Sequence, residues 1–286
     1  MGSFVLLFPG QGSQEPEMAA TVAELRPDLA ERVTAIVGED PFARVADGTR
    51  FAQPAIFCAA IAGLERLGRP DADLYAGHSL GEITALVAAG ALSEEDGLQI
   101  VAERGRLMDR AAAETPGGML AVRAERTEAE ALAARHDLVV ANDNAPKQIV
   151  LSGPDAGIEA AEAEAEASES GLRVKRLPVA GAFHSPLLEH VVEPFLAAMG
   201  EIEVRQPRAP VYSCVTAAPF DDDPRDCLAK ALVSPVRWVE VLHAVHAAGG
   251  RSFVETGPGK VLSGLVKHSL DDVEVTAPEP AEASGS

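Results

Sequence analysis

A serine stands between two glycines in the stretch Gly77-His78-Ser79-Leu80-Gly81, which has the G-x-S-x-G spacing of a nucleophile elbow. In such an elbow a strand turns sharply into a helix and lifts the serine hydroxyl, so the positions around it must be small. The apolar run from Leu74 predicts the strand, and residues 83–89, followed by Gly90, predict the helix. The backbone N–H groups that open this helix would face an oxyanion formed at the serine. We therefore predict that Ser79 is a nucleophile.

His184 is the strongest candidate for a base that would activate this serine. It is followed by Ser185 and Pro186, a pair typical of the cap and the first position of a helix. The dipole of that helix would disfavour the charged imidazole and keep it basic. A histidine that only caps local structure is the alternative, and a companion serine favours the catalytic role. His78 is expected to pack or hydrogen-bond locally, and the other histidines are predicted to lack companions: His136, His190, His243, His246 and His268.

Arg104 lies on the apolar face of a helix predicted over residues 93–113. The residues one turn away from it are Ile100, Val101, Leu107 and Met108, whereas the neighbours of Arg106 are mostly charged. A guanidinium directed into the interior requires an anionic partner, because an unpaired buried charge is costly. Two partners remain open: a buried carboxylate in a structural salt bridge, or a substrate carboxylate held by two hydrogen bonds.

The segments that must position these residues alternate between strands and helices. The apolar run 4–8 predicts a buried parallel strand, which ends in the glycine-rich loop 9–14. Helices are predicted over 18–36, 53–67 and 93–113, the last with Ser93 as its cap and Asp96 three positions on. The later elements are a strand at 209–213, a helix that opens at 234–238 and runs to 248, a strand at 253–255 and a helix at 261–268.

A second pattern begins at Gly117. Strands are predicted at 119–122, 138–141, 149–151 and 172–179, with helices at 127–135 and 156–170 and a connection through 142–146 between the middle strands. The order βαββαβ is that of a ferredoxin-like unit. We therefore predict a large domain from residues 1–115 and 181–276, an inserted small domain at 116–180, and a disordered tail at 277–286.

Composition restricts the class of protein further. The chain has 286 residues, 47% of them hydrophobic, enough for a sizeable core in one large or two unequal domains. The net charge of −20 argues against nucleic-acid binding, which requires a basic surface. No apolar run has membrane length and no basic region opens the chain, so we expect a soluble cytoplasmic protein. Cys58, Cys214 and Cys227 have no partner at metal-binding spacing, so we expect neither a metal nor a redox cofactor.

Five stretches together resemble the signature set of the acyl-carrier-protein malonyltransferases, the transacylases of fatty-acid and polyketide synthesis. They are Phe8-Pro9-Gly10-Gln11-Gly12-Ser13-Gln14, Gly77-His78-Ser79-Leu80-Gly81-Glu82, Glu103-Arg104-Gly105-Arg106, Phe183-His184-Ser185 and Glu255-Thr256-Gly257-Pro258-Gly259. The match is collinear over nearly the whole chain. It implies an α/β fold, with an α/β-hydrolase-like core built on a parallel sheet and an inserted ferredoxin-like (βαββαβ) subdomain.

The resemblance also assigns catalytic roles to matching residues. Ser79 would be the nucleophile and His184 its base, without an acidic third member. The backbone N–H groups of Gln11 and Leu80 would form the oxyanion hole. The histidine would be oriented by a main-chain carbonyl, for which the matching position is about Ala231.

Four further residues match positions that bind the acyl group. Arg104 would hold the malonyl carboxylate, Gln53 would line the pocket, and Asn144 lies in the matching loop of the small domain. Phe183 agrees with the malonyl type and would crowd an α-methyl group, a discrimination worth about 1–3 kcal/mol. Related domains often carry His-Ala-Phe-His or Tyr-Ala-Ser-His here, whereas this chain begins the motif with Gly181.

The implied reaction transfers a malonyl group from malonyl-CoA to the phosphopantetheine thiol of acyl carrier protein, through a malonyl-serine ester. No cofactor, nucleic acid or membrane is implied, and a monomer is expected. Carrier proteins are generally acidic, so docking would need a basic patch drawn from Lys147, Arg173, Lys175, Arg176, Lys260 and Lys267.

Three alternatives remain. The chain could be a discrete acyltransferase that serves a polyketide synthase in trans, an acyl hydrolase of the same fold, or a non-catalytic module that binds carrier proteins. Arg104 argues against the hydrolase, and the intact pair of Ser79 and His184 argues against the module.

Overall fold

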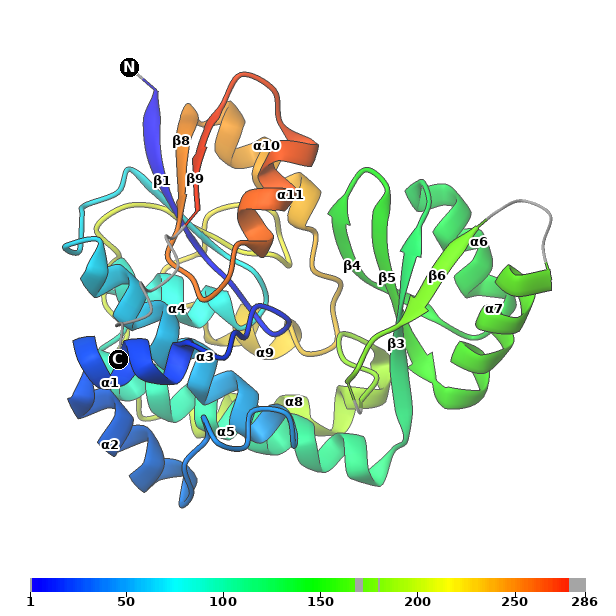
Figure 1. Cartoon of the computed structure of the whole chain (residues 1–286), viewed down its shortest axis with the longest axis horizontal. Coiled ribbons are helices and arrows are strands. Elements are labelled where there is room, and N and C mark those ends of the chain that lie inside the picture. The colour runs from blue at the N-terminus through cyan, green and yellow to red at the C-terminus, as the bar shows by residue number, and fades with distance from the viewer. Residues whose placement is uncertain (1, 168–171, 180, 278–286) are drawn as a thin grey trace, which may run out of the picture.

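Two β-sheets organise the chain in the computed structural model, which describes residues 2–167, 172–179 and 181–277 (Figure 1). The larger sheet has five parallel strands in the order β7-β2-β1-β8-β9. These strands are β1 (Ser3–Phe8), β2 (Leu74–Gly77), β7 (Val211–Tyr212), β8 (Gly250–Glu255) and β9 (Glu274–Thr276). The predicted α/β class with a parallel core sheet is confirmed, although β9 has no counterpart among the predicted elements.

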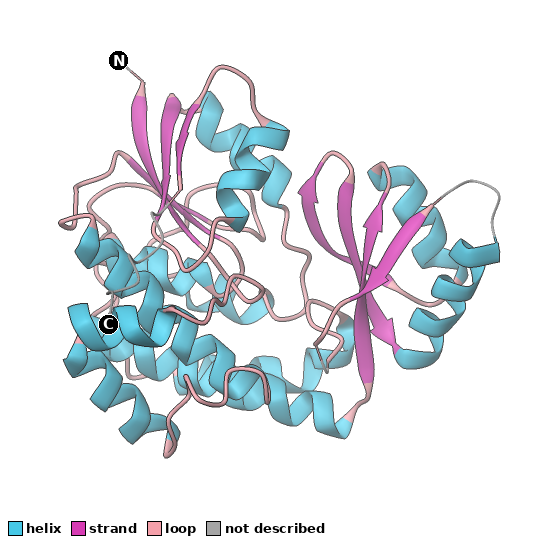
Figure 2. Ribbon diagram, in the orientation of Figure 1, coloured by secondary structure: helices cyan, strands magenta, loops and turns pink. Residues whose placement is uncertain are grey.

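Helices cover both faces of this parallel sheet (Figure 2). They are α1 (Met18–Leu25), α2 (Pro27–Val37), α3 (Thr49–Arg66), α4 (Gly81–Ala88), α5 (Glu94–Glu114), the 3₁₀ helix η1 (Pro186–Val191), α8 (Val192–Ala198), α9 (Arg225–Lys230), α10 (Trp238–Ala247) and α11 (Val261–Ser269). Side chains alternate along β1: Leu6 and Phe8 pack in the cluster that includes α3, α4 and α5, whereas Val5 and Leu7 pack with α10 and α11. The period of two along one strand therefore separates the two hydrophobic cores.

Two helix predictions are wrong in their details. The single helix predicted over 18–36 breaks at Arg26, whose φ of −143° is not helical, and Pro27 opens α2. Proline suits that first position because its missing N–H would have no partner within the helix. The α-helix predicted directly after His184 is instead η1 followed by α8, although Ser185 does cap η1 through its side chain.

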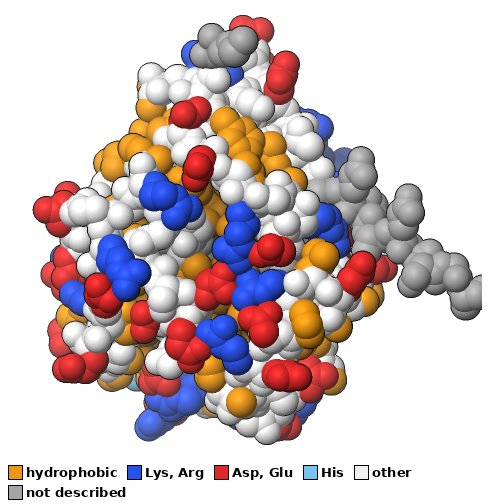
Figure 3. All heavy atoms as spheres, turned by 90° about the vertical axis from the view of Figure 1, so that its left-hand side faces the viewer, with side chains coloured by type: hydrophobic (Ala, Val, Ile, Leu, Met, Phe, Trp, Pro, Cys, Tyr) orange, Lys and Arg blue, Asp and Glu red, His pale blue; other side chains and the backbone are white. Residues whose placement is uncertain are grey.

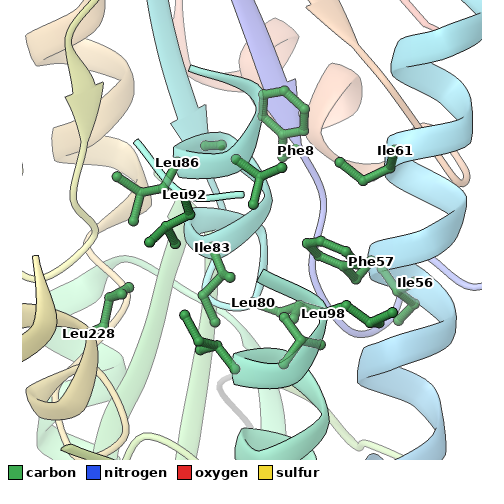
Figure 4. Packing of buried hydrophobic residues seen from close by; sticks show 14 of the residues in the cluster. Phe8, Ile56, Phe57, Ile61, Leu80, Ile83, Leu86, Leu92, Leu98 and Leu228 are labelled. Atoms are coloured by element: carbon green, nitrogen blue, oxygen red, sulfur yellow. The ribbon is translucent and has the colours of Figure 1, made fainter. Parts of the chain in front are cut away.

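The core beneath the nucleophile elbow is packed between α3, α4 and α5. Figure 4 shows Phe57 of α3, Ile83 of α4 and Leu98 of α5 converging there, and all three are at most 1% exposed. Full burial of each such side chain contributes about 1.5–3 kcal/mol to the free energy of unfolding, relative to the same side chain left exposed. Ser93 accepts a hydrogen bond from the Asp96 N–H at 3.0 Å and caps α5, as predicted. This packing fixes the position of α4, which begins just after Ser79, and of α5, which bears Arg104.

The smaller sheet is antiparallel and follows the predicted βαββαβ order. Its strands are β3 (Gly117–Arg123), β4 (Val139–Ala145), β5 (Gln148–Pro154) and β6 (Arg173–Arg176), in the sheet order β4-β5-β3-β6. Helices α6 (Arg126–Arg135) and α7 (Asp155–Ala167) cover one face around a separate core that contains Leu120, Leu151 and Ile158. The opposite face of the sheet turns toward the large domain (Figure 1). The ferredoxin-like unit is therefore confirmed.

The exact division into 1–115 with 181–276 and 116–180 stays a prediction. The predicted disordered tail lies, apart from Ala277, outside the described residues. In the part of the chain that the structure describes, no helix has the length and apolar character to cross a bilayer.

Acidic and basic side chains are intermixed over the described surface of the large domain seen in Figure 3. Several ion pairs in the large domain join such side chains: Arg26 contacts Asp28 and Glu94 at 2.7 Å, and Arg69 contacts Glu65 at 2.6 Å. Such exposed pairs contribute little to stability, but they cancel charge locally. Several cations of the large domain are therefore paired with carboxylates in a chain whose net charge is −20.

Candidate active site

The nucleophile elbow forms between β2 and α4 as the glycine spacing predicts. Ser79 has a φ of 53°, a left-handed conformation that side chains other than glycine rarely adopt. A Cβ at Gly77 would lie 2.0 Å from the backbone of Gly81, and a Cβ at Gly81 would lie 2.0 Å from the carbonyl oxygen of Phe8. Both glycines are therefore required because two backbone segments cross at the turn.

Ser79 and His184 are brought together although 105 residues separate them. The Oγ of Ser79 lies 2.8 Å from Nε2 of His184. Nδ1 of the same ring lies 2.8 Å from the carbonyl oxygen of Ala231 and 3.1 Å from that of Ser234. Carbonyl oxygens only accept hydrogen bonds, so Nδ1 carries the proton and Nε2 is free to accept the serine proton. The carbonyl expected at Ala231 is in place, and Ser234 supplies a second one that the sequence did not indicate.

Burial determines the protonation state of His184. The ring is 5% exposed, and burial together with the positive charge of Arg104 lowers the pKa of His184 to about 3. The carbonyls of Ala231 and Ser234 oppose this shift without reversing it. The histidine is therefore neutral at pH 7, as expected, but desolvation is the main cause rather than the dipole of the helix that follows.

Arg104 points from α5 directly at the nucleophile. Its side chain is 3% exposed, Nη1 donates to Oε1 of Gln53 at 2.7 Å, and Nη2 donates to Oγ of Ser79 at 3.0 Å. Among the described residues no carboxylate oxygen lies within 4 Å of this guanidinium, so the structural salt bridge is absent there. Burial lowers the pKa of Arg104 to about 10, which Glu82 opposes, and the group stays charged at pH 7. A buried positive charge next to the nucleophile is therefore left for an anionic ligand.

Gln53 is held so that its carbonyl oxygen faces Arg104. Its Nε2 donates to Oγ1 of Thr49 at 2.8 Å and approaches Sδ of Met108 at 3.2 Å. Thr49 in turn donates to Oε1 of Gln11 at 2.7 Å. Thr49 and Met108 were not among the predicted site residues. The sequence could have indicated both residues. Thr49 lies one helical turn before Gln53 on α3, and Met108 lies one turn after Arg104 on α5.

All the predicted site residues except Ala231, which contacts His184 from behind the ring, line one cavity of about 190 Å³. The large domain contributes Gln11, Gln53, Ser79, Leu80, Arg104, Phe183 and His184, and the small domain contributes Asn144 together with Met119, Asn142 and Val150. Neither the Gln11 nor the Leu80 backbone N–H donates to another described residue. Those two N–H groups are therefore available to an oxyanion at this cavity.

Asn144 and His78 connect the elbow to the small domain. Asn144 lies within β4 rather than in the loop expected between the strands, and its Oδ1 is 2.7 Å from Nε2 of His78. The His78 ring also contacts Trp238 edge to face, at 5.4 Å between centroids. The expectation that His78 packs or hydrogen-bonds locally is wrong as to its partners, because Asn144 and Trp238 are both distant in the sequence.

The other histidines do not line the cavity. Nε2 of His246 is buried without a hydrogen-bond partner among the described residues, whereas His136 and His190 each lie near a carboxylate. His136 contacts Glu164 at 2.7 Å, and His190 approaches Glu114 at 3.7 Å. In the described ranges no group of three or more His, Cys, Asp or Glu side chains could hold a metal ion. The cavity instead contains a hydroxyl, an imidazole, a guanidinium and free backbone N–H groups. These are the groups that acyl transfer through an oxyanion requires.

The fold and this cavity define an acyltransferase, and the chain belongs to the acyl transferase family, whose domain model matches residues 5–282. The malonyl CoA-acyl carrier protein transacylase of Bacillus subtilis is 36% identical, with 99% of this chain and 96% of that protein covered. The polyketide biosynthesis protein ThaF of Burkholderia thailandensis is 37% identical over 98% of this chain, which spans only 25% of ThaF. The malonyl-CoA:acyl carrier protein transacylase structure from Xanthomonas oryzae matches with a TM-score of 0.87 at 34% identity, covering 97% and 94% of the two chains.

Proposed function

We propose that this protein transfers a malonyl group from malonyl-CoA to the phosphopantetheine thiol of acyl carrier protein through an ester on Ser79. The observation that carries the proposal is the position of Arg104. Its buried guanidinium has no carboxylate within 4 Å among the described residues and donates to the nucleophile itself. A malonyl group attached to Ser79 would bring its own carboxylate to that charge.

The first half-reaction begins at the Ser79–His184 pair. Nε2 of His184 takes the hydroxyl proton as Oγ attacks the thioester carbonyl of malonyl-CoA. The resulting oxyanion accepts hydrogen bonds from the N–H groups of Gln11 and Leu80. The tetrahedral species then expels the CoA sulfur, which receives the proton from His184, and the malonyl-serine ester remains.

The second half-reaction reverses these steps with another thiol. His184 takes the proton of the phosphopantetheine thiol, the sulfur attacks the ester carbonyl, and Oγ of Ser79 leaves with the proton. Arg104 holds the malonyl carboxylate throughout, so the acyl group fills the space that water would need. Two carbonyls on Nδ1 keep the ring in one tautomer in both directions.

Phe183 is proposed to limit the size of the acyl group. Its side chain is 6% exposed and lines the cavity next to His184. Met108, Met119 and Val150 close the same cavity from α5 and the small sheet. An α-methyl group would have to displace one of these side chains, which agrees with a preference for malonyl over methylmalonyl units.

A basic groove is proposed to receive the carrier protein. On the open face of the small sheet Met119 lines the active-site cavity, whereas Ala121 and Arg123 line a second cavity of about 670 Å³ further along the strand. Lys175 and Arg173 of β6 lie beside them and line the same cavity. The face therefore leads from the nucleophile to a cluster of cations that suits an acidic partner.

The six candidate cations differ in whether they line this groove and whether a carboxylate already pairs with them. Arg176 pairs with Asp155, and Lys147 lines the groove but lies 3.4 Å from Glu125. Neither Lys260 nor Lys267 lines it. Arg173 and Lys175 have no ion pair with another described residue, so we propose these two as the docking cations.

The cavity also bears on the oligomeric state and on cofactors. The cavity holds every group that both half-reactions need, so we propose that the enzyme works as a monomer without a cofactor. We also infer a cytoplasmic location and a carrier protein of fatty-acid or polyketide synthesis. A discrete acyltransferase that serves a polyketide synthase in trans would use the same chemistry with a different carrier.

Intact-protein mass spectrometry after brief mixing with acyl-CoA tests the proposal. Wild type should gain a malonyl adduct from malonyl-CoA, Ser79→Ala should gain none, and Arg104→Ala should gain little. Equal labelling by acetyl-CoA would refute the malonyl assignment. Release of CoA without a lasting adduct would favour the acyl hydrolase, and failure to react at all would favour a non-catalytic carrier-binding module.

A further inference from the structure

A buried carboxylate lies behind the nucleophile and has no role in the steps above. Glu82 is in the first turn of α4, three residues after Ser79, and is 1% exposed. Its Oε1 accepts a hydrogen bond of 2.7 Å from the backbone N–H of Cys214. The side chain of Ser213 is a second hydrogen-bonding partner. Neutral donors do not fully compensate a buried negative charge, so a nearby positive charge would further stabilise the ionised carboxylate.

That charge belongs to Arg104. Burial raises the pKa of Glu82 to about 7, and the nearby guanidinium opposes the rise. Burial likewise lowers the pKa of Arg104, and Glu82 is the charged group that opposes this. The two do not form an ion pair, because the guanidinium donates to Gln53 and Ser79 instead. When Glu82 is ionised, the site therefore contains one positive and one negative charge, both buried and without direct contact.

The remaining groups that face Glu82 do not change charge near pH 7. Ser213 and Cys214 lie after β7, and Cys227 lies on α9, where its Sγ is 3.1 Å from Oγ of Ser213. Burial raises the pKa of both thiols. His184 is already neutral because burial lowers its pKa. Glu82 is therefore the group in this cluster that can gain or lose a proton in the neutral range.

We propose that Glu82 is the countercharge of Arg104 in the empty site and takes up a proton when a substrate carboxylate binds there. The inference rests on the proposed function. A malonyl carboxylate contacts the guanidinium directly, so two carboxylates then share one positive charge in a buried site. The one without direct contact, Glu82, accepts a proton from solvent, and no covalent bond changes. An acetyl group brings no charge and leaves Glu82 as it was.

The sign of the pH dependence follows from this linkage. Below the pKa of Glu82 the carboxyl is already protonated, and binding takes up no proton. Above that pKa each malonyl group that binds takes up one, so the affinity for malonyl-CoA should fall by up to about tenfold per pH unit. The affinity for acetyl-CoA should show no such fall, because the acetyl group has no charge. Titration of the CoA phosphates affects both ligands equally, so the difference between the two ligands reports on Glu82. Glu82 thereby makes the recognition of a charged acyl group dependent on pH.

Calorimetry on the Ser79→Ala variant, which cannot form the ester, tests this directly. Malonyl-CoA and acetyl-CoA are titrated at pH 8 in two buffers of different ionisation enthalpy, and the difference in heat gives the protons taken up. We expect about one proton for malonyl-CoA and none for acetyl-CoA. Adding Glu82→Gln should abolish the uptake, because glutamine keeps an acceptor for the Cys214 N–H but cannot titrate.

Glu103→Gln is the matched control. Glu103 is also on α5, next to Arg104 in the sequence, but it pairs with Arg106 at the surface. This variant should take up the same proton as its parent. Binding of malonyl-CoA without proton uptake, or uptake that survives Glu82→Gln, would overturn the inference alone. Malonyl-CoA that binds no better than acetyl-CoA at any pH would overturn the proposed function and the inference with it.

Discussion

Removal of the Arg104 guanidinium should lower serine loading from malonyl-CoA much more than serine loading from acetyl-CoA. A malonyl carboxylate would receive two charge-assisted hydrogen bonds from Nη1 and Nη2, each worth about 1.5–3 kcal/mol. Their loss in Arg104→Ala amounts to about 4 kcal/mol, or about a thousandfold in kcat/KM for serine loading from malonyl-CoA. Acetyl-CoA forms neither bond, so its loading should change by less than about tenfold.

Rapid-mixing mass spectrometry of the acyl-enzyme measures both substrates on the same preparation. The acetyl-CoA rate serves as an internal control, because Arg104 also affects the pKa of His184 and donates to Ser79. Arg104→Lys should recover only part of the loss, since one ammonium cannot form the planar pair of bonds. Equal losses for malonyl-CoA and acetyl-CoA would refute the reasoning, because they would assign Arg104 to the nucleophile rather than to the substrate carboxylate.

Four other predictions follow from single features of the site. Phe183→Ser should raise kcat/KM for methylmalonyl-CoA relative to malonyl-CoA by about 10–200-fold, measured by competitive loading, and an unchanged ratio would exclude Phe183 as the determinant. Burial lowers the pKa of His184 to about 3, so the base form persists as pH falls, and acetyl-CoA loading should be level from pH 5 to 8; an inflection near 6.5 would show a solvated imidazole. Gly81→Ala should lower the thermal midpoint and loading together, because its Cβ would meet the Phe8 carbonyl oxygen, whereas loading at the wild-type rate would mean that the elbow relaxes freely. Arg173→Glu with Lys175→Glu should slow transfer to carrier protein and leave serine loading intact; equal effects on both steps would remove the groove from docking.

Local elements were predictable because neighbouring residues encode them. Gly77 and Gly81 permit the elbow around Ser79, and Ser93 caps α5 through its own side chain. The βαββαβ order also followed from short apolar runs interrupted by two helical segments. The single helix predicted over 18–36 was wrong for a local reason as well. Pro27 begins a second helix, although the apolar residues continue through the break.

The sequence by itself determined the fold class, the residues that carry chemistry and the presence of an inward-facing arginine. Only the tertiary structure decided that Arg104 faces Ser79 and Gln53 rather than a carboxylate. It also decided that desolvation keeps His184 neutral and that Glu82 shares the buried charge of the site. The physical reason is that burial, and contacts between residues far apart in the chain, arise from packing of whole elements. A carbonyl such as that of Ala231 has no side-chain signature. The family resemblance alone indicated this position, and the contact itself became visible once α9 was placed beside the histidine.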